Sequence, residues 1–187
     1  MKSKIISISA ITSALVALVL SAGVFFEFVD LFALAISSAI VLLPLYYKSY
    51  LGSLLSVLCG GLVALIFTGF NFFSIVFPAF FGYFGTFPIL ACYLREKRFN
   101  IIAYKIIGLI WCVASFFGIY YYYTFIMNVP FNDLPSIVSK YIYWFVLLAS
   151  VIFYFVFDRY ILVSKLFINR YVSRIISRDK WKRMMRE

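Results

Sequence analysis

Long apolar runs separated by short polar or charged stretches form the dominant pattern of this chain. The clearest run extends from Phe72 to Leu94, contains no charged residue, and is followed by the basic cluster Arg95, Lys97 and Arg98. As an α-helix it would be about 34 Å long, slightly more than the hydrocarbon core of a bilayer. Backbone amides find no water to bond within lipid, so this run is predicted to be a membrane-spanning helix.

Five further apolar runs flank this one and are bounded by charged or turn-forming residues. The sequence therefore predicts an all-α integral membrane protein, a six-transmembrane-helix bundle. The expected spans are residues 5–26, 31–47, 50–70, 72–94, 101–127 and 137–164. Together they form one membrane domain, residues 1–166, followed by a tail of residues 167–187.

The charges at the ends of the runs predict an orientation. Basic residues in short loops remain in the cytoplasm, whereas acidic residues have little influence. The segments on one side hold Lys2, Lys4, Lys48, Arg95, Lys97, Arg98 and the basic tail. The turns on the other side hold Glu27, Asp30 and Asp133, with Lys140 nearby. Both termini are therefore expected to be cytoplasmic, in a multi-pass membrane protein.

Composition strengthens the membrane prediction and narrows the chemistry. The 187 residues are 65% hydrophobic and 13% charged, with a mean hydropathy of +1.03, which is too apolar for a soluble domain of this length. The net charge of +10 resides mostly at predicted helix ends and in the tail, which favours anionic lipid over nucleic acid as a partner. Histidine is absent and the three cysteines form no CxxC pair, so no metal site and no cofactor are expected.

Catalysis is not expected either. No acidic or basic residue lies near the middle of a predicted span, whereas intramembrane enzymes and proton-coupled carriers usually need ionisable groups at depth. The chain also offers no serine–histidine pair, because it has no histidine. The sequence therefore predicts a non-catalytic protein.

Small residues recur along the first predicted span. Four-residue spacing places them on two adjoining faces of a helix, where a second helix can approach closely. The faces hold Ser9, Ser13 and Ala17, and the AxxxA pair Ala10 and Ala14. They are candidates for docking a partner membrane subunit. A close contact within the bundle also explains them, and the sequence alone favours this second interpretation.

The span 72–94 contains two prolines, Pro78 and Pro88, on either side of Gly82 and Gly85. A proline removes a backbone donor and bends a helix, which leaves carbonyl groups in need of polar partners. The sequence predicts a bent, notched helix that either lines a cavity or packs closely against its neighbours.

Aromatic and polar residues gather at the predicted outer ends of the helices. An interfacial aromatic belt explains many of them. Aromatic walls with a few convergent polar groups also suit a small-molecule site, so these residues are candidate substrate ligands. The set is Glu27, Asp30, Asn71, Tyr120, Tyr122, Tyr123, Asn128, Asp133, Lys140, Tyr143 and Trp144.

Basic residues repeat every four positions along the tail, with apolar residues between them. This pattern is typical of an amphipathic helix that lies on the inner leaflet and binds membrane lipids. The candidate lipid-binding residues are Arg170, Arg174, Arg178, Lys182 and Arg186.

Taken together, these features resemble the S components of energy-coupling factor (ECF) vitamin transporters. The resemblance rests on the length, six spans, inward termini, the pair Ala10 and Ala14, the stretch FFGYFGTFPIL and the Arg-rich end. It implies a substrate-binding, multi-pass subunit of a bacterial cytoplasmic membrane that serves the uptake of a vitamin-like small molecule. It also implies that the alanine face docks on a transmembrane ECF subunit and that separate ATPase subunits hydrolyse ATP. No vitamin-specific motif is present, so the substrate class stays open.

A protein of a different class fits the same pattern. A non-catalytic cell-envelope scaffold, similar to the rod-shape protein MreD, is also small and polytopic. The scaffold hypothesis predicts no ligand and an outer aromatic cluster that is only interfacial.

Overall fold

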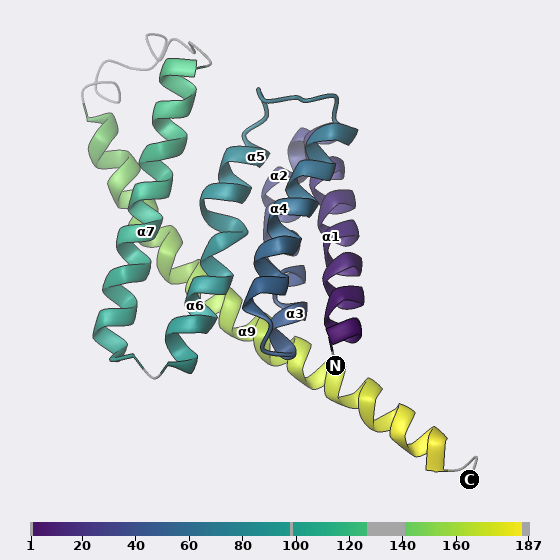
Figure 1. The fold of residues 1–187 in the computed structure, drawn as a ribbon. Helices are drawn as coiled ribbons and strands as arrows, with labels where there is room; N and C mark the ends of the chain where they lie inside the picture. The colour runs from purple at the N-terminus through teal and green to yellow at the C-terminus, as the bar shows by residue number, and fades with distance from the viewer. Residues whose placement is uncertain (1, 98, 127–140, 185–187) are drawn as a thin grey trace.

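A computed structural model describes residues 2–97, 99–126 and 141–184, and within these ranges the chain is helical without any strand (Figure 1). This confirms the predicted all-α class. The elements are α1 (Lys2–Phe25), η1 (Glu27–Val29), α2 (Asp30–Ile40), α3 (Leu43–Tyr46), α4 (Tyr50–Phe67), α5 (Val76–Ala79), η2 (Phe80–Phe84), α6 (Thr86–Glu96), α7 (Ile101–Tyr121), η3 (Tyr122–Ile126) and α9 (Ile142–Met184).

Within the described ranges, five helical stretches are long and apolar enough to cross a membrane. They are Ile5–Phe25, Tyr50–Phe67, Val76–Glu96, Ile101–Phe125 and Ile142–Val172. Many of their large apolar side chains are exposed, including Leu18 and Ile110, as expected for surfaces that face lipid. The chain therefore has the helices of a multi-pass membrane protein.

The second predicted span differs from the others. It is realised as the shorter apolar stretch Asp30–Tyr46, about 25 Å long if fully helical, and it is divided into α2 and α3. Pro44 lies at the start of α3 and has no amide hydrogen to donate to the carbonyl of Ile40. The regular hydrogen-bond ladder is therefore interrupted, and α2 ends at Ile40.

Helix α1 packs closely against α4. The hydroxyl of Ser56 on α4 donates a 3.0 Å hydrogen bond to the carbonyl of Ser9 on α1. A Cβ added to Gly60 would lie 2.8 Å from Cγ1 of Val16, and one added to Gly52 would lie 2.5 Å from Oγ of Ser9. Glycine at these positions lets the two backbones approach, which is how small residues hold membrane helices together.

The run predicted as residues 72–94 begins four residues later, at Val76, and continues to Glu96. Within it, η2 is a π-helical segment between the two prolines, which agrees with the predicted irregularity. The carbonyl oxygen of Gly82 lies within hydrogen-bond distance of Thr86 Oγ1 (3.1 Å), Trp111 Nε1 (3.2 Å) and Ser115 Oγ (3.0 Å). Polar side chains from this helix and α7 therefore satisfy a backbone acceptor within an apolar stretch.

An aromatic core joins this central helix to α9. Tyr83, Phe87 and Tyr154 are almost fully buried, and the rings of Tyr83 and Phe87 stack with centroids 5.0 Å apart. The ring of Phe84 meets the ring of Phe157 on α9 edge-on, also at 5.0 Å. The aromatic part of the core therefore lies where η2 and α6 meet α9, and it is continuous with buried apolar residues of α1, α2 and α4.

Helix α9 is much longer than a single membrane span. It begins beside α7, passes behind α6 and continues beyond the end of the bundle that holds the N-terminus (Figure 1). The hydroxyl of Tyr160 donates a 2.7 Å hydrogen bond to the carbonyl of Ala35 on α2, which ties the middle of α9 to the first half of the chain. Residues 167–184, predicted as a tail, continue α9 without a break.

Candidate functional site

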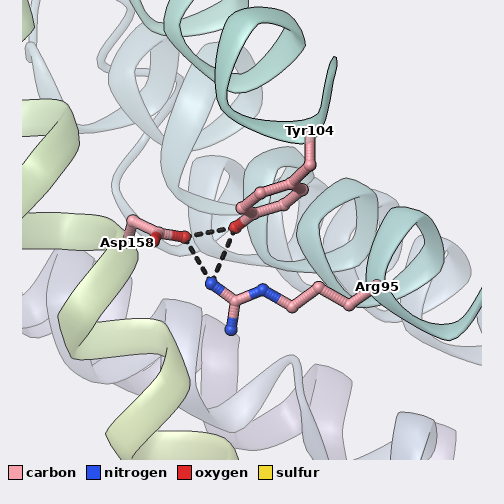
Figure 2. A network of polar contacts seen from close by, with 3 residues as sticks. All are labelled: Arg95, Tyr104 and Asp158. Atoms are coloured by element: carbon pink, nitrogen blue, oxygen red, sulfur yellow. Dashed lines mark hydrogen bonds and ion pairs between the residues drawn. The ribbon is translucent and has the colours of Figure 1, made fainter. Parts of the chain in front are cut away.

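The most developed polar site of the described residues lies where α6 ends. Arg95 comes from the last turn of α6, Tyr104 from the first turn of α7 and Asp158 from the middle of α9 (Figure 2). Nη2 of Arg95 lies 2.7 Å from Oδ1 of Asp158 and 2.9 Å from the hydroxyl of Tyr104. That hydroxyl also donates a hydrogen bond to Oδ1 of Asp158. Three helices therefore meet at one carboxylate oxygen.

The network is partly shielded from solvent. The side chain of Asp158 is 15% exposed and that of Arg95 is 27% exposed. The guanidinium carbon of Arg95 also lies 4.8 Å from the centroid of the Tyr104 ring, within the range of a cation–π interaction. A carboxylate in such a position needs both a counter-charge and hydrogen-bond donors, and Arg95 and Tyr104 supply them.

A second ion pair follows directly along α6. Oε1 of Glu96 lies 3.4 Å from Nζ of Lys165 on α9, and its other carboxylate oxygen accepts a hydrogen bond from Tyr50 on α4. Asp158 and Lys165 are about two helical turns apart, so the end of α6 contacts one face of α9 at two levels. On α6 the basic residue precedes the acidic one, whereas on α9 the acidic residue comes first. Arg95 can therefore pair with Asp158 while Glu96 pairs with Lys165.

A half-open cavity of about 390 Å³ adjoins the Arg95 network. It combines three basic side chains and one carboxylate with a tyrosine ring and several apolar side chains. The lining residues are Arg95, Phe99, Ile101, Tyr104, Lys105, Phe155, Asp158, Arg159 and Leu162. Positive charge beside apolar surface suits a ligand that is itself both anionic and apolar. No group of three or more His, Cys, Asp or Glu side chains in the described ranges is placed to hold a metal ion.

The predicted outer site is divided between two places. The hydroxyl of Tyr122 donates to the carbonyl of Phe72, and Tyr123 lies close enough to Asp30 for an electrostatic interaction. These contacts bring η3 to the turn before α5 and to the start of α2. Elsewhere, Tyr120 and Tyr143 form an edge-on ring pair between α7 and α9, with centroids 5.7 Å apart.

Among the remaining members of the predicted outer set, the structure describes Trp144 and Asn71, which join neither group. Trp144 is 71% exposed, as expected of a side chain that faces lipid, and Asn71 is also exposed. Asn128, Asp133 and Lys140 lie outside the described residues, as does the side chain of Glu27.

The two small-residue faces of α1 have different surroundings. Ser9 contacts α4, Ser13 donates a 2.9 Å hydrogen bond to the carbonyl of Ser9, and Ala17 is buried. Ala10 and Ala14 are exposed on the adjoining face of the helix. The first face therefore packs within the bundle, while the AxxxA pair lies on its surface.

Four of the five predicted lipid-binding residues belong to the last part of α9. Arg170 is exposed. The backbone of Arg174, Arg178 and Lys182 belongs to α9, but their side chains lie outside the described part of the chain, as does Arg186.

Sequence reasoning treated Arg95 only as a topological anchor and assigned no role to Tyr104 or Asp158. One signal was present, because Asp158 is an acid that directly follows the uncharged run from residue 141 to residue 157. Its partner is 63 residues away, and helix periodicity relates residues only within one helix. The pairing therefore required the tertiary arrangement.

Comparisons with known proteins add no relative. No family model, no curated protein and no solved structure matches this chain.

Proposed function

We propose that this chain is the substrate-binding membrane subunit of an ECF-type transporter that takes up a vitamin-like small molecule. In this proposal it resides in a bacterial cytoplasmic membrane and binds its substrate without catalysis. Separate ATPase subunits hydrolyse ATP, and a transmembrane ECF subunit docks on α1.

The exposure of Ala10 and Ala14 is the observation that carries the proposal. The neighbouring positions Ser13 and Ala17 pack inward, yet these two alanines lie on the surface one helical turn apart. Large apolar side chains such as Ile6 and Leu18 surround them on the same exposed side. An alanine pair within an apolar surface lets a second helix approach closely, which is the contact that a docking subunit would need.

Contacts at the opposite end support a substrate site there. Tyr122 and Tyr123 come together with Asp30 and the backbone of Phe72, so aromatic rings, a carboxylate and a carbonyl group converge from three segments. Such a combination suits a small polar molecule with hydrogen-bonding groups.

A six-span topology with both termini inside completes the proposal. The stretch Asp30–Tyr46 is short for a span, but it returns the chain between the end of α1 and the start of α4 (Figure 1). The N-terminus, the turn before α4 and the turn between α6 and α7 then share one end of the bundle. That end carries Lys48, Arg95 and Lys97, which supports its placement in the cytoplasm.

Affinity purification of the tagged protein in mild detergent, followed by mass spectrometry of bound proteins and small molecules, tests the proposal. The wild type should recover transmembrane and ATPase subunits, and the A10L/A14L variant should lose them. The variant A114L/A149L is the matched control, because Ala114 and Ala149 are exposed on α7 and α9 and their replacement should leave the complex intact. Recovery of wall-synthesis proteins without a small molecule would instead support the MreD-like scaffold. Retention of the ECF subunits by A10L/A14L would contradict the docking face.

A further inference from the structure

The cavity beside the Arg95–Tyr104–Asp158 network carries an excess of positive charge. Its lining includes Arg95, Lys105 and Arg159 but only one carboxylate, Asp158. Arg95 and Tyr104 already engage that carboxylate. Lys105 and Arg159 are exposed and form no ion pair with any residue that the structure describes. The electrostatic balance of the cavity therefore calls for a bound anion.

The other half of the cavity is apolar. Phe99, Ile101 and Phe155 line it and remain 49%, 71% and 52% exposed. From Phe155 an exposed apolar stripe continues along α9 through Ile152 and Leu148, towards the middle of the span. A small inorganic anion would make no use of this surface, whereas an acyl chain would cover it.

The position of the cavity matches the depth of a lipid headgroup. Arg95 and Lys105 lie on either side of the turn between α6 and α7, where the two apolar spans end. Long basic side chains at such positions extend towards the interface and attract anionic lipid. A volume of about 390 Å³ lies at the lower end of the range of ligand sites, which is enough for a phosphate headgroup while the acyl chains remain outside.

We propose that this cavity binds the phosphodiester headgroup of an anionic phospholipid, held by Lys105 and Arg159, with an acyl chain along the Phe155–Ile152–Leu148 stripe. Arg95 is committed to Asp158 and positions the wall of the site. The site is separate from the outer substrate site and from the α1 docking face, so it does not depend on the ECF proposal.

Native mass spectrometry of the purified protein, titrated with phosphatidylglycerol or with phosphatidylcholine of the same acyl chains, tests this inference. The wild type should bind phosphatidylglycerol more tightly. The variant K105Q/R159Q should bind the first phosphatidylglycerol roughly thirtyfold more weakly, since each basic residue near a membrane surface contributes about a factor of five. Arg95 and Asp158 are unchanged in this variant, so the network that joins the three helices is retained.

Two further variants separate the site from general surface charge. K48Q/K97Q removes two basic residues near the same end of the bundle that do not line the cavity, and it should bind like the wild type. K105R/R159K keeps both charges and should retain the preference for phosphatidylglycerol.

The source of the phosphate is tested by competition with glycerol 3-phosphate. Failure of this soluble anion to displace the lipid at equal concentration would support the lipid site. Full displacement would overturn it in favour of a soluble phosphate ligand. Equal binding of both lipids by the wild type, full binding by K105Q/R159Q, or an equal loss in K48Q/K97Q would also overturn the proposal.

Discussion

Arg95 and Asp158 form a 2.7 Å ion pair that joins the end of α6 to the middle of α9 across 63 residues of sequence. Tyr104 of α7 shares the same carboxylate oxygen. This contact holds three helices together beside the half-open cavity, so its removal should destabilise the packing of all three.

Breaking the pair should destabilise the protein. R95M leaves the partly buried carboxylate of Asp158 without its counter-charge. It should lower the free energy of unfolding by about 2 kcal/mol, a loss between those caused by breaking an exposed ion pair and a fully buried one. The double variant R95M/D158L removes both charges and should lose less than the sum of R95M and D158L. Thermal unfolding of the four proteins in detergent measures the coupling. Strict additivity would show that the two side chains do not stabilise each other.

The contact between α1 and α4 should be sensitive to a single methyl group. G60A places a Cβ 2.8 Å from Cγ1 of Val16 and 3.0 Å from the carbonyl oxygen of Ser13. Neither a branched side chain nor the backbone can move aside easily, so this variant should lower the free energy of unfolding by about 1–3 kcal/mol. G118A is the matched control, since a Cβ on Gly118 in α7 meets nothing within 4 Å. It should be neutral or stabilising by up to about 1 kcal/mol, as alanine favours a helix. Equal midpoints of thermal unfolding for the two variants would contradict the close contact.

The carbonyl of Gly82 should tolerate the loss of one polar neighbour but not of all. W111F or S115A alone leaves other donors beside this acceptor, and each should cost about 0.5–1 kcal/mol. The triple variant T86V/W111F/S115A leaves the carbonyl without these side chains and should cost more than the sum of the single changes. Thermal unfolding of the single and triple variants measures these losses of stability. A loss in the triple variant equal to or below the sum of the three single losses would show that these side chains do not act together.

The proposed topology can be read from cysteine labelling in whole cells. In a background without Cys59, Cys92 and Cys112, N71C should react with a membrane-impermeant maleimide in intact cells. K48C should react only after the membrane is opened, because the basic end is proposed to be cytoplasmic. Both positions are exposed in turns, so access is limited by sidedness alone. The reverse pattern would place Lys48 outside and invert the bundle.

Several features followed from residues close together in the sequence. The apolar runs predicted helices because lipid offers no partner to a backbone amide, and the prolines at 78 and 88 predicted an irregular segment that is realised as η2. Helix length was less predictable. Pro44 ends α2 early, and the basic residues after position 166 extend α9 rather than end it.

Other relations were decided only when the helices packed. The small residues of α1 were compatible with either an internal or an external contact, and the position of α4 buries Ala17 while Ala10 and Ala14 stay exposed. The sequence placed Tyr120 and Tyr122 in one predicted outer site. In the structure the ring of Tyr120 pairs with that of Tyr143, whereas the hydroxyl of Tyr122 donates to the carbonyl of Phe72.

The sequence by itself determined that this chain is an all-helical protein with spans long and apolar enough for a membrane, because hydrophobicity and backbone hydrogen bonding act within each segment. The tertiary structure alone decided that Arg95, Tyr104 and Asp158 meet and that a charged, half-open cavity forms beside them. The physical reason is that helix periodicity specifies which residues share a face, but not which face of which other helix that face will contact.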